Sequence, residues 1–169
     1  AILEQTASHV WHTLTSKSGA PHYSVDNQHR AADFAIIGYG KLGGIELGYG
    51  SDLDIVFLHD SCGQQQMTNG AKPLENQVFF ARLAQKIIHA LSTYTHDGRL
   101  YEIDTRLRPS GSSGLLVSSA EAFRQYQLEK AWIWEHQALL RARVIYGTPS
   151  LQAQFEQMRR DVLCQKRDL

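Results

Sequence analysis

The segment FAIIGYGKLGGIELGYGSDLDIVFL, residues 34–58, decides the fold and raises the question of function. Two apolar runs, residues 34–37 and 53–58, have the length and composition of neighbouring buried strands, and a glycine-rich loop joins them. The loop contains GYGKLG, which matches the G-x-G-x-x-G spacing of a dinucleotide-binding turn. The second run opens with Asp52 and Asp54, a pair of carboxylates that a dinucleotide site does not need. The two halves of the segment therefore indicate different chemistries.

The acidic pair indicates a metal site. Residues two apart in a strand share a face, so Asp52 and Asp54 point the same way if Leu53 and Ile55 point into the core. Like charges this close raise the pKa of one carboxyl unless a cation lies between them. Magnesium commonly uses one or two carboxylates together with substrate phosphates. The structural alternative is a solvated strand end that happens to carry two acidic residues.

A later segment carries a third candidate carboxylate. Residues 100–108, LYEIDTRLR, alternate in polarity, which predicts a strand with one charged face bearing Glu102, Asp104, Arg106 and Arg108. If this strand lies beside the strand of the acidic pair, three carboxylates and two guanidiniums converge. That is the composition that two-metal phosphoryl or nucleotidyl transfer needs. Alternatively, the two arginines protect an exposed sheet edge.

The glycine-rich loop is suited to phosphate binding. Glycines let backbone N–H groups approach phosphate oxygens, and Lys41 adds a point charge. A dinucleotide site also needs a helix directly after the glycines and further β-α units, whereas here the next strand follows soon and most of the remaining chain is helical. We therefore favour a triphosphate, and a dinucleotide-binding module is kept as an alternative. The candidate phosphate-binding glycines are Gly38, Gly40, Gly43 and Gly44.

The apolar spacing predicts four helical regions: residues 2–16, a helix from Glu75, a region from Ser118 to about Arg143, and a helix from Pro149. Residues 16–30 and 61–73 are expected to be polar connections. We interpret the apolar residues near the end of the third region as helix-packing residues rather than a stacking platform for bases. They are Trp132, Trp134, Leu139 and Leu140.

Composition restricts the possible partners. Lysine and arginine number 17, as do aspartate and glutamate, so no basic field favours nucleic acid. Cys62 and Cys164 form no metal-binding spacing, and reduced cysteines suit a cytoplasmic protein. No run reaches 18 apolar residues, and no signal-peptide pattern opens the chain, so we expect no membrane association. The first residue, alanine, suggests a fragment.

Four ordered motifs resemble a known family. GYGKLGG, ELGYGSDLDIVFLHD, YEIDTRLRPSGSSGLLV and WEHQALLRARVIYG, within residues 34–147, are similar to the glutamine synthetase adenylyltransferase family of the polymerase-β-like nucleotidyltransferase superfamily. The family carries two catalytic halves, and the wording YEIDTRLRPSG with WEHQALLRARV is more similar to the C-terminal half, which adenylylates. The resemblance implies an α+β fold with a small mixed sheet flanked by helices. It also implies three regions: an N-terminal helix and linker (1–30), a nucleotidyltransferase core (31–118) and a truncated helical extension (119–169).

The resemblance also implies roles for residues. Asp52 and Asp54 would bind two magnesium ions, and Asp104 would complete the catalytic-metal site and help activate a tyrosine hydroxyl. The glycine loop and Ser51 would hold the phosphates of ATP. That Arg106 and Arg108 are electrostatic helpers is our own inference and not part of the resemblance. Glutamine synthetase is the implied protein substrate, and removal of AMP by the other catalytic half is the alternative activity. The PII regulatory protein is an implied partner of the full-length enzyme.

Overall fold

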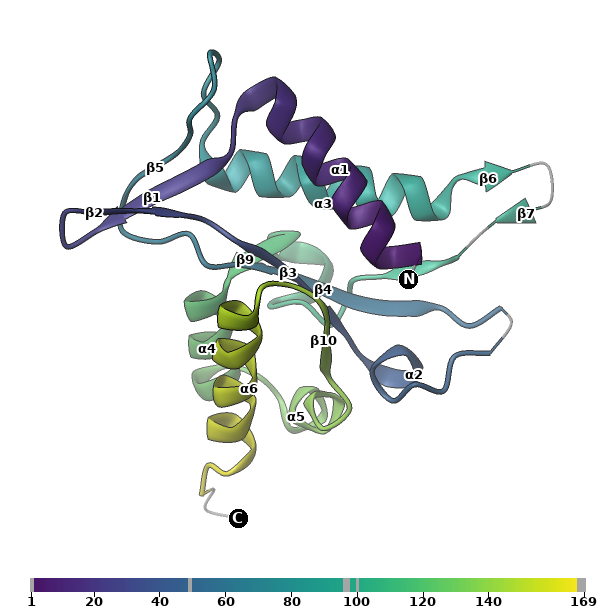
Figure 1. The fold of residues 1–169 in the computed structure, drawn as a ribbon. Helices are drawn as coiled ribbons and strands as arrows, with labels where there is room; N and C mark the ends of the chain where they lie inside the picture. The colour runs from purple at the N-terminus through teal and green to yellow at the C-terminus, as the bar shows by residue number, and fades with distance from the viewer. Residues whose placement is uncertain (1, 49, 96–97, 100, 167–169) are drawn as a thin grey trace.

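The computed structural model describes residues 2–48, 50–95, 98–99 and 101–166, and its centre is a mixed sheet. Its strands are β3 (Phe34–Gly38), β4 (Leu53–His59), β8 (Ile103–Asp104), β9 (Val117–Ser119) and β10 (Arg143–Tyr146). The order is β10-β3-β4-β8, with antiparallel pairing on the β10 and β3 side of β4. On its other side β4 pairs in parallel with β8 along its first residues and with β9 along its last. Strand β4 is therefore the axis of the sheet (Figure 1).

Helices cover both faces of this sheet (Figure 1). One face packs against α1 (Ile2–Ser18) and α3 (Asn76–Ser92), and the other against α4 (Ala120–Glu129), α5 (Ile133–Leu139) and α6 (Pro149–Leu163). Two buried clusters result, one on each face. The arrangement confirms the expected α+β fold with a small mixed sheet flanked by helices.

Strand β4 is apolar except for Asp54 and the terminal His59, because both of its faces are covered. Leu53, Ile55 and Phe57 enter the cluster under α1 and α3, while Val56 and Leu58 enter the cluster under α4 and α6. The alternation puts Asp54 on the second face, the side of the helices that follow β9. This confirms the expected inward direction of Leu53 and Ile55.

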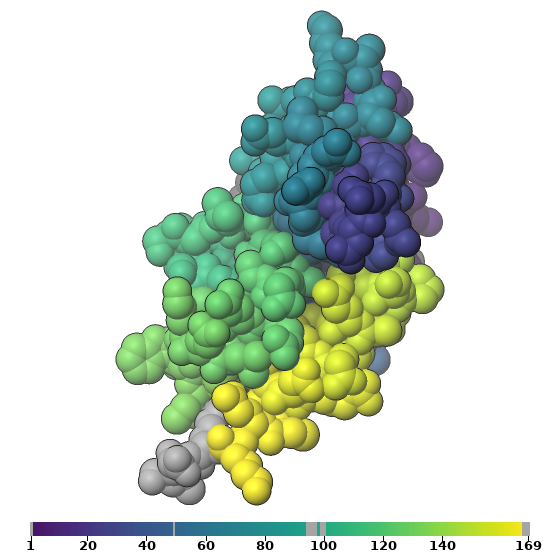
Figure 2. Space-filling model, turned by 90° about the vertical axis from the view of Figure 1, so that its left-hand side faces the viewer, coloured from purple at the N-terminus to yellow at the C-terminus, as the bar shows by residue number. Residues whose placement is uncertain are grey.

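The C-terminal helices share their core with the sheet. Phe123 of α4 and Phe155 of α6 belong to the same buried cluster as Ile37 of β3. Figure 2 shows the green and yellow C-terminal segments together at one end of the molecule and the purple and teal segments at the other. The division at residue 118 stays a prediction, and in the structure the residues on both sides of it contribute to one core.

A second, three-stranded sheet occupies segments that we expected to be polar connections, and both expectations were wrong. Its order is β2 (Gln28–Ala31), β1 (Pro21–Val25), β5 (Gln64–Thr68), all antiparallel. Asp26 and Asn27 both have positive φ, the conformation of a tight two-residue hairpin turn. The hairpin escaped prediction because Asp-Asn is a weaker turn signal than Asn-Gly and because β2 and β5 carry mostly exposed polar residues.

The strand expected over residues 100–108 is much shorter in the structure. Within its described part only Ile103–Asp104 is β8, and the chain then turns, with the Arg108 N–H donating to the Thr105 carbonyl at 3.2 Å. Leu100 lies outside the described residues. A 3-10 turn, η1 (Gly111–Ser113), follows before β9. The expected charged face is therefore in large part a turn.

The helical region expected over residues 118–143 is interrupted. Helix α4 ends at Glu129, α5 begins at Ile133, and the chain continues into β10 at Arg143. Ser119, not Ser118, caps α4, because its hydroxyl accepts the Ala122 N–H at 3.1 Å. The remaining described pieces are α2 (Gly40–Gly43) and the short pair β6 (Tyr94–Thr95) and β7 (Gly98–Arg99). None of the described helices is long and apolar enough to span a bilayer.

Candidate active site

Two of the three expected carboxylates lie side by side. Asp54 of β4 and Asp104 of β8 are register partners in a parallel pair, and the Leu53 N–H donates to the Glu102 carbonyl at 2.8 Å. Register partners in neighbouring strands project to the same face of a sheet. The short strand β8 therefore places the carboxylate of Asp104, from a distant segment, next to Asp54.

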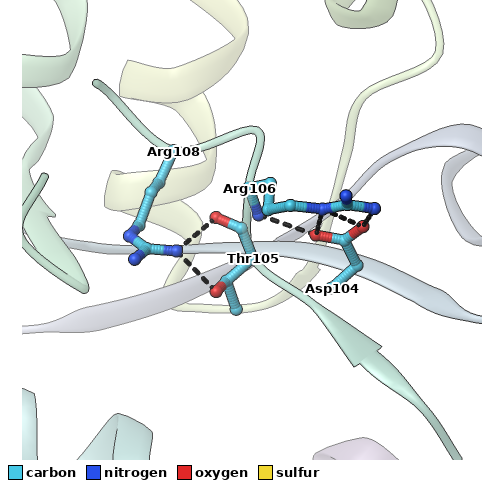
Figure 3. A network of polar contacts seen from close by, with 4 residues as sticks. All are labelled: Asp104, Thr105, Arg106 and Arg108. Carbon is cyan, nitrogen blue, oxygen red and sulfur yellow. Dashed lines mark hydrogen bonds and ion pairs between the residues drawn. The ribbon is translucent and has the colours of Figure 1, made fainter. Parts of the chain in front are cut away.

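Asp104 is held by an arginine two residues later (Figure 3). Nε of Arg106 donates to Oδ1 at 3.0 Å and to Oδ2 at 2.8 Å, and Nη2 donates to Oδ2 at 2.5 Å. The Arg106 backbone N–H adds a contact to Oδ1 at 2.8 Å. These charge-assisted hydrogen bonds lower the pKa of Asp104 and keep it ionised. The turn after β8 thus supplies Asp104 with its own counter-ion.

Asp54 has the opposite electrostatics. Its pKa is raised, first by partial burial and then by the negative charges of Asp104 and Asp52, while Arg106 and Lys41 oppose the shift. A cation between the carboxylates would relieve this repulsion. Asp52 precedes β4 and is exposed.

The glycine turn lies directly beside Asp54. The Tyr39 N–H donates to the Asp54 carbonyl at 2.9 Å, and α2 begins at the next residue. Gly40 has φ +53, and a Cβ built on it would lie 2.8 Å from Oδ2 of Asp54. Only a residue without a side chain fits this close approach. Gly40 therefore keeps the turn against the carboxylate.

A Cβ added at the other candidate glycines would contact protein atoms rather than open space. A Cβ at Gly43 would lie 1.9 Å from the backbone oxygen of Arg141, and one at Gly38 would lie 2.8 Å from the Ile145 side chain. At Gly44 the nearest atom is the flexible end of Arg141. Contacts of this kind indicate close packing of the loop on β10. The phosphate-binding role of these glycines stays a prediction.

Among the described residues, a hollow of about 460 Å³ opens at the two partnered carboxylates. Its walls combine acidic, basic and apolar groups from the glycine turn, both strands and α5. They are Gly40, Asp54, Asp104, Arg106, Leu107, Trp134, Ala138 and Arg141. A larger hollow, about 640 Å³, lies between α1 and β10 and contains none of the predicted site residues. The chemistry therefore favours the smaller one.

A second hollow of about 460 Å³ adjoins the first and shares Asp104 and Arg106 with it. Asp52 and Arg108 line this second hollow but not the first. Arg108 donates from Nη1 to the Thr105 carbonyl at 2.9 Å and to its hydroxyl at 2.7 Å, so it holds the turn after β8 (Figure 3).

The Ser51 hydroxyl accepts the Gly48 N–H at 3.3 Å, and Lys41 is exposed.

The carboxylates are suited to magnesium only in part. Asp54 and Asp104 supply the two carboxylates that magnesium uses beside substrate phosphates. Among residues 2–48, 50–95, 98–99 and 101–166, however, no group of three or more histidine, cysteine, aspartate or glutamate side chains is placed to hold a metal ion. Asp52 lines a hollow with Asp104 but not with Asp54, so neither of the two hollows contains all three carboxylates. The two-ion assignment stays a prediction.

Four residues of the first hollow were not predicted as site residues: Leu107, Trp134, Ala138 and Arg141. The packing role expected for the apolar residues near α5 was wrong for Trp132, Trp134 and Leu140, which are exposed, and it was confirmed for Leu139, which is fully buried. Helical periodicity does not reveal which side of a seven-residue helix faces the core. Nor does it show that Arg141, which forms an ion pair with Glu46, borders the acidic strands.

Carboxylates from adjoining strands lie beside a glycine turn, which is the arrangement expected of a site that handles phosphoryl groups. The model of the glutamate-ammonia ligase adenylyltransferase family matches residues 1–158, and the chain belongs to that family.

Two curated relatives are each named bifunctional glutamine synthetase adenylyltransferase/adenylyl-removing enzyme. The chain is 59% identical over 169 residues to the protein of Thioalkalivibrio sulfidiphilus and 55% identical over 167 residues to that of Hahella chejuensis. Each match covers 99% of the chain but 17% of the relative.

Proposed function

We propose that this domain transfers AMP from ATP to a tyrosine hydroxyl of glutamine synthetase. The tyrosine hydroxyl loses its proton and its oxygen bonds to the α-phosphorus, the bond from that phosphorus to the oxygen shared with the β-phosphorus breaks, and pyrophosphate leaves. The names of the relatives support the substrate and the reaction. The observation that carries the proposal is the register pairing of Asp54 with Asp104 at the mouth of one hollow.

Each residue receives a role from its place. Asp54 and Asp104, with Asp52 approaching from the neighbouring hollow, would hold magnesium, which supplies charge neutralisation for the triphosphate. Asp104 is also the group that helps to activate the tyrosine hydroxyl. Gly40 leaves room for phosphate oxygens next to Asp54, and Arg106 provides positive charge at the same place. The other loop glycines, Lys41, Ser51 and Arg108, support the site from the surrounding turns.

The alternative activity is removal of AMP, in which an oxygen of inorganic phosphate bonds to the phosphorus of the adenylyl group, the bond from that phosphorus to the tyrosine oxygen breaks, and the products are ADP and the free tyrosine. The relatives carry both activities in their name, and the same carboxylates serve either direction. The motif YEIDTRLRPSG favours the adenylylating half. A dinucleotide-binding module is disfavoured because β3 and β4 are antiparallel and joined through a four-residue helix, whereas that fold needs a parallel β-α-β unit. Binding of PII stays a prediction for the full-length enzyme.

Transfer of radiolabelled AMP from ATP to purified glutamine synthetase tests the proposal. Adenylylated glutamine synthetase with inorganic phosphate, in a parallel reaction, tests the reverse activity. Asp54→Asn should abolish both label transfer and label release. Asp26→Asn is the matched control, because Asp26 lies in a remote hairpin turn whose positive φ asparagine also adopts. Parent-like transfer by Asp54→Asn, or label release without label transfer by the parent, would refute adenylylation at this site.

A further inference from the structure

We propose that Trp134 is the surface on which the adenine base of ATP stacks, an inference that rests on the proposed function. The lining of the first hollow combines two kinds of side chain. Asp54, Asp104, Arg106 and Arg141 are charged, and Leu107, Trp134 and Ala138 are apolar. A nucleotide needs both kinds of partner, because it has a flat aromatic base at one end and a charged phosphate chain at the other.

Trp134 is placed to meet a ligand rather than to fill the core. Its side chain is 55% exposed although it lines the hollow. Trp132, the N-cap residue just before the same helix, is 72% exposed and does not border the hollow. An isolated exposed apolar residue needs no explanation, but an exposed indole that lines a hollow with charged groups offers a stacking face beside the proposed phosphate site. Base stacking on aromatic side chains tolerates any base, because every base has a π-face.

Hydrogen bonds of the two buried residues that follow Trp134 hold its backbone in place. Glu135, the next residue, is buried and accepts hydrogen bonds from the Trp132 N–H at 2.8 Å and from the Tyr126 hydroxyl at 3.0 Å. His136 is also buried, with Nε2 lying 2.7 Å from the Gln127 carbonyl. These contacts hold the start of α5 against α4. The ring is therefore presented from a fixed segment, which reduces the ordering cost of binding.

The hollow also has a suitable size. Small-molecule sites commonly enclose about 300–1,000 Å³, and this hollow measures about 460 Å³. Its lining combines apolar side chains with a few charged ones, a composition that orients a ligand. Stacking on Trp134 would leave the triphosphate to extend toward Asp54 and Gly40. The indole would thus fix which end of the nucleotide lies at the carboxylates.

Calorimetric titration distinguishes the contribution of the base to binding affinity from that of the phosphates. The parent, Trp134→Ala, Trp134→Phe and the control Trp132→Ala are each titrated with MgATP and with magnesium tripolyphosphate, which has no base. We expect Trp134→Ala to weaken MgATP binding about tenfold or more and to leave tripolyphosphate binding unchanged. Trp134→Phe should keep most of the affinity because the phenyl ring still stacks, and Trp132→Ala should match the parent for both ligands.

The outcomes distinguish this inference from the proposed function. Parent-like MgATP binding by Trp134→Ala, or an equal loss for both ligands, would overturn the stacking role. A parent that binds neither ligand would refute the proposed nucleotide site itself. Indole fluorescence is a second measurement that needs no alanine variant: MgATP should quench the parent and Trp132→Phe, and should leave Trp134→Phe unquenched. A quench that survives in Trp134→Phe also overturns the proposal.

Discussion

Gly43→Ala should destabilise the fold sharply, although the change adds a single methyl group. The new Cβ would lie 1.9 Å from the backbone oxygen of Arg141 and 2.7 Å from that of Gly38, whereas real Cβ atoms essentially never approach closer than 3.0 Å. Both obstacles are backbone, so α2 must move away from the end of β3 and from the residues just before β10. That movement also stretches the 3.1 Å hydrogen bond from Nε of Arg143 to the Gly43 carbonyl.

Overpacking typically costs about 1–3 kcal/mol, and two backbone obstacles place Gly43→Ala near the upper end, about 3 kcal/mol. For a chain of this size the melting temperature should fall by about 10 °C. Thermal and urea unfolding of the parent, Gly43→Ala and Gly48→Ala measure the effect. Gly48 is the matched control, because its nearest neighbour for an added Cβ is Oγ of Ser51 at 3.8 Å. If the two alanine variants unfold alike, the packing argument for this glycine is refuted.

Three further changes test the site and the electrostatics. Asp104→Asn should leave MgATP affinity within a few-fold of the parent while AMP transfer falls about 10²-fold or more, measured by single-turnover transfer beside nucleotide titration. Arg106→Ala should tighten magnesium binding several-fold in calorimetry, because Asp104 loses its internal counter-ion. Burial raises the pKa of Asp60 to about 6, so the folded chain holds a proton that the unfolded chain has released between about pH 4 and 6, and stability falls as the pH rises through that window. In thermal melts the free energy of unfolding of Asp60→Asn should therefore be higher than that of the parent at pH 8 by about 1 kcal/mol, after allowance for partial exposure. Near pH 4 the two should be equally stable.

The sequence was most informative where burial forces a pattern. Strands β3 and β4 are apolar on both faces because helices cover both sides of the sheet, and α3 shows the three- and four-residue spacing of a helix with one buried side. These three elements were predicted and are confirmed. The charges within and next to such segments, Asp54 and Asp104, stood out for the same reason. An apolar strand that carries a carboxylate departs from the pattern that its packing requires.

The elements that were missed depend on partners distant in the chain. Strand β10 pairs with β3 across about a hundred residues, and neither its position nor its register follows from local periodicity. The exposed side of α5 is set by how Glu135, His136 and Leu139 pack, which left Trp134 on the wall of the first hollow. The hairpin of β1 and β2 is stabilised by backbone pairing and a turn rather than by an apolar face.

The alternation of residues 100–108 predicted correctly that Asp104 lies beside Asp54, although the long charged strand on which that prediction depended is wrong. A long charged strand would have aligned Asp104 and Arg106 along one face, two residues apart. The structure instead ends β8 at Asp104, and the turn brings the guanidinium of Arg106 back onto that carboxylate. Because Arg106 already compensates Asp104, the uncompensated charge in the first hollow is that of Asp54, whose pKa is raised. A cation entering between the two carboxylates therefore gains most from Asp54 and must compete with Arg106 for Asp104, which is why removing that guanidinium should strengthen metal binding.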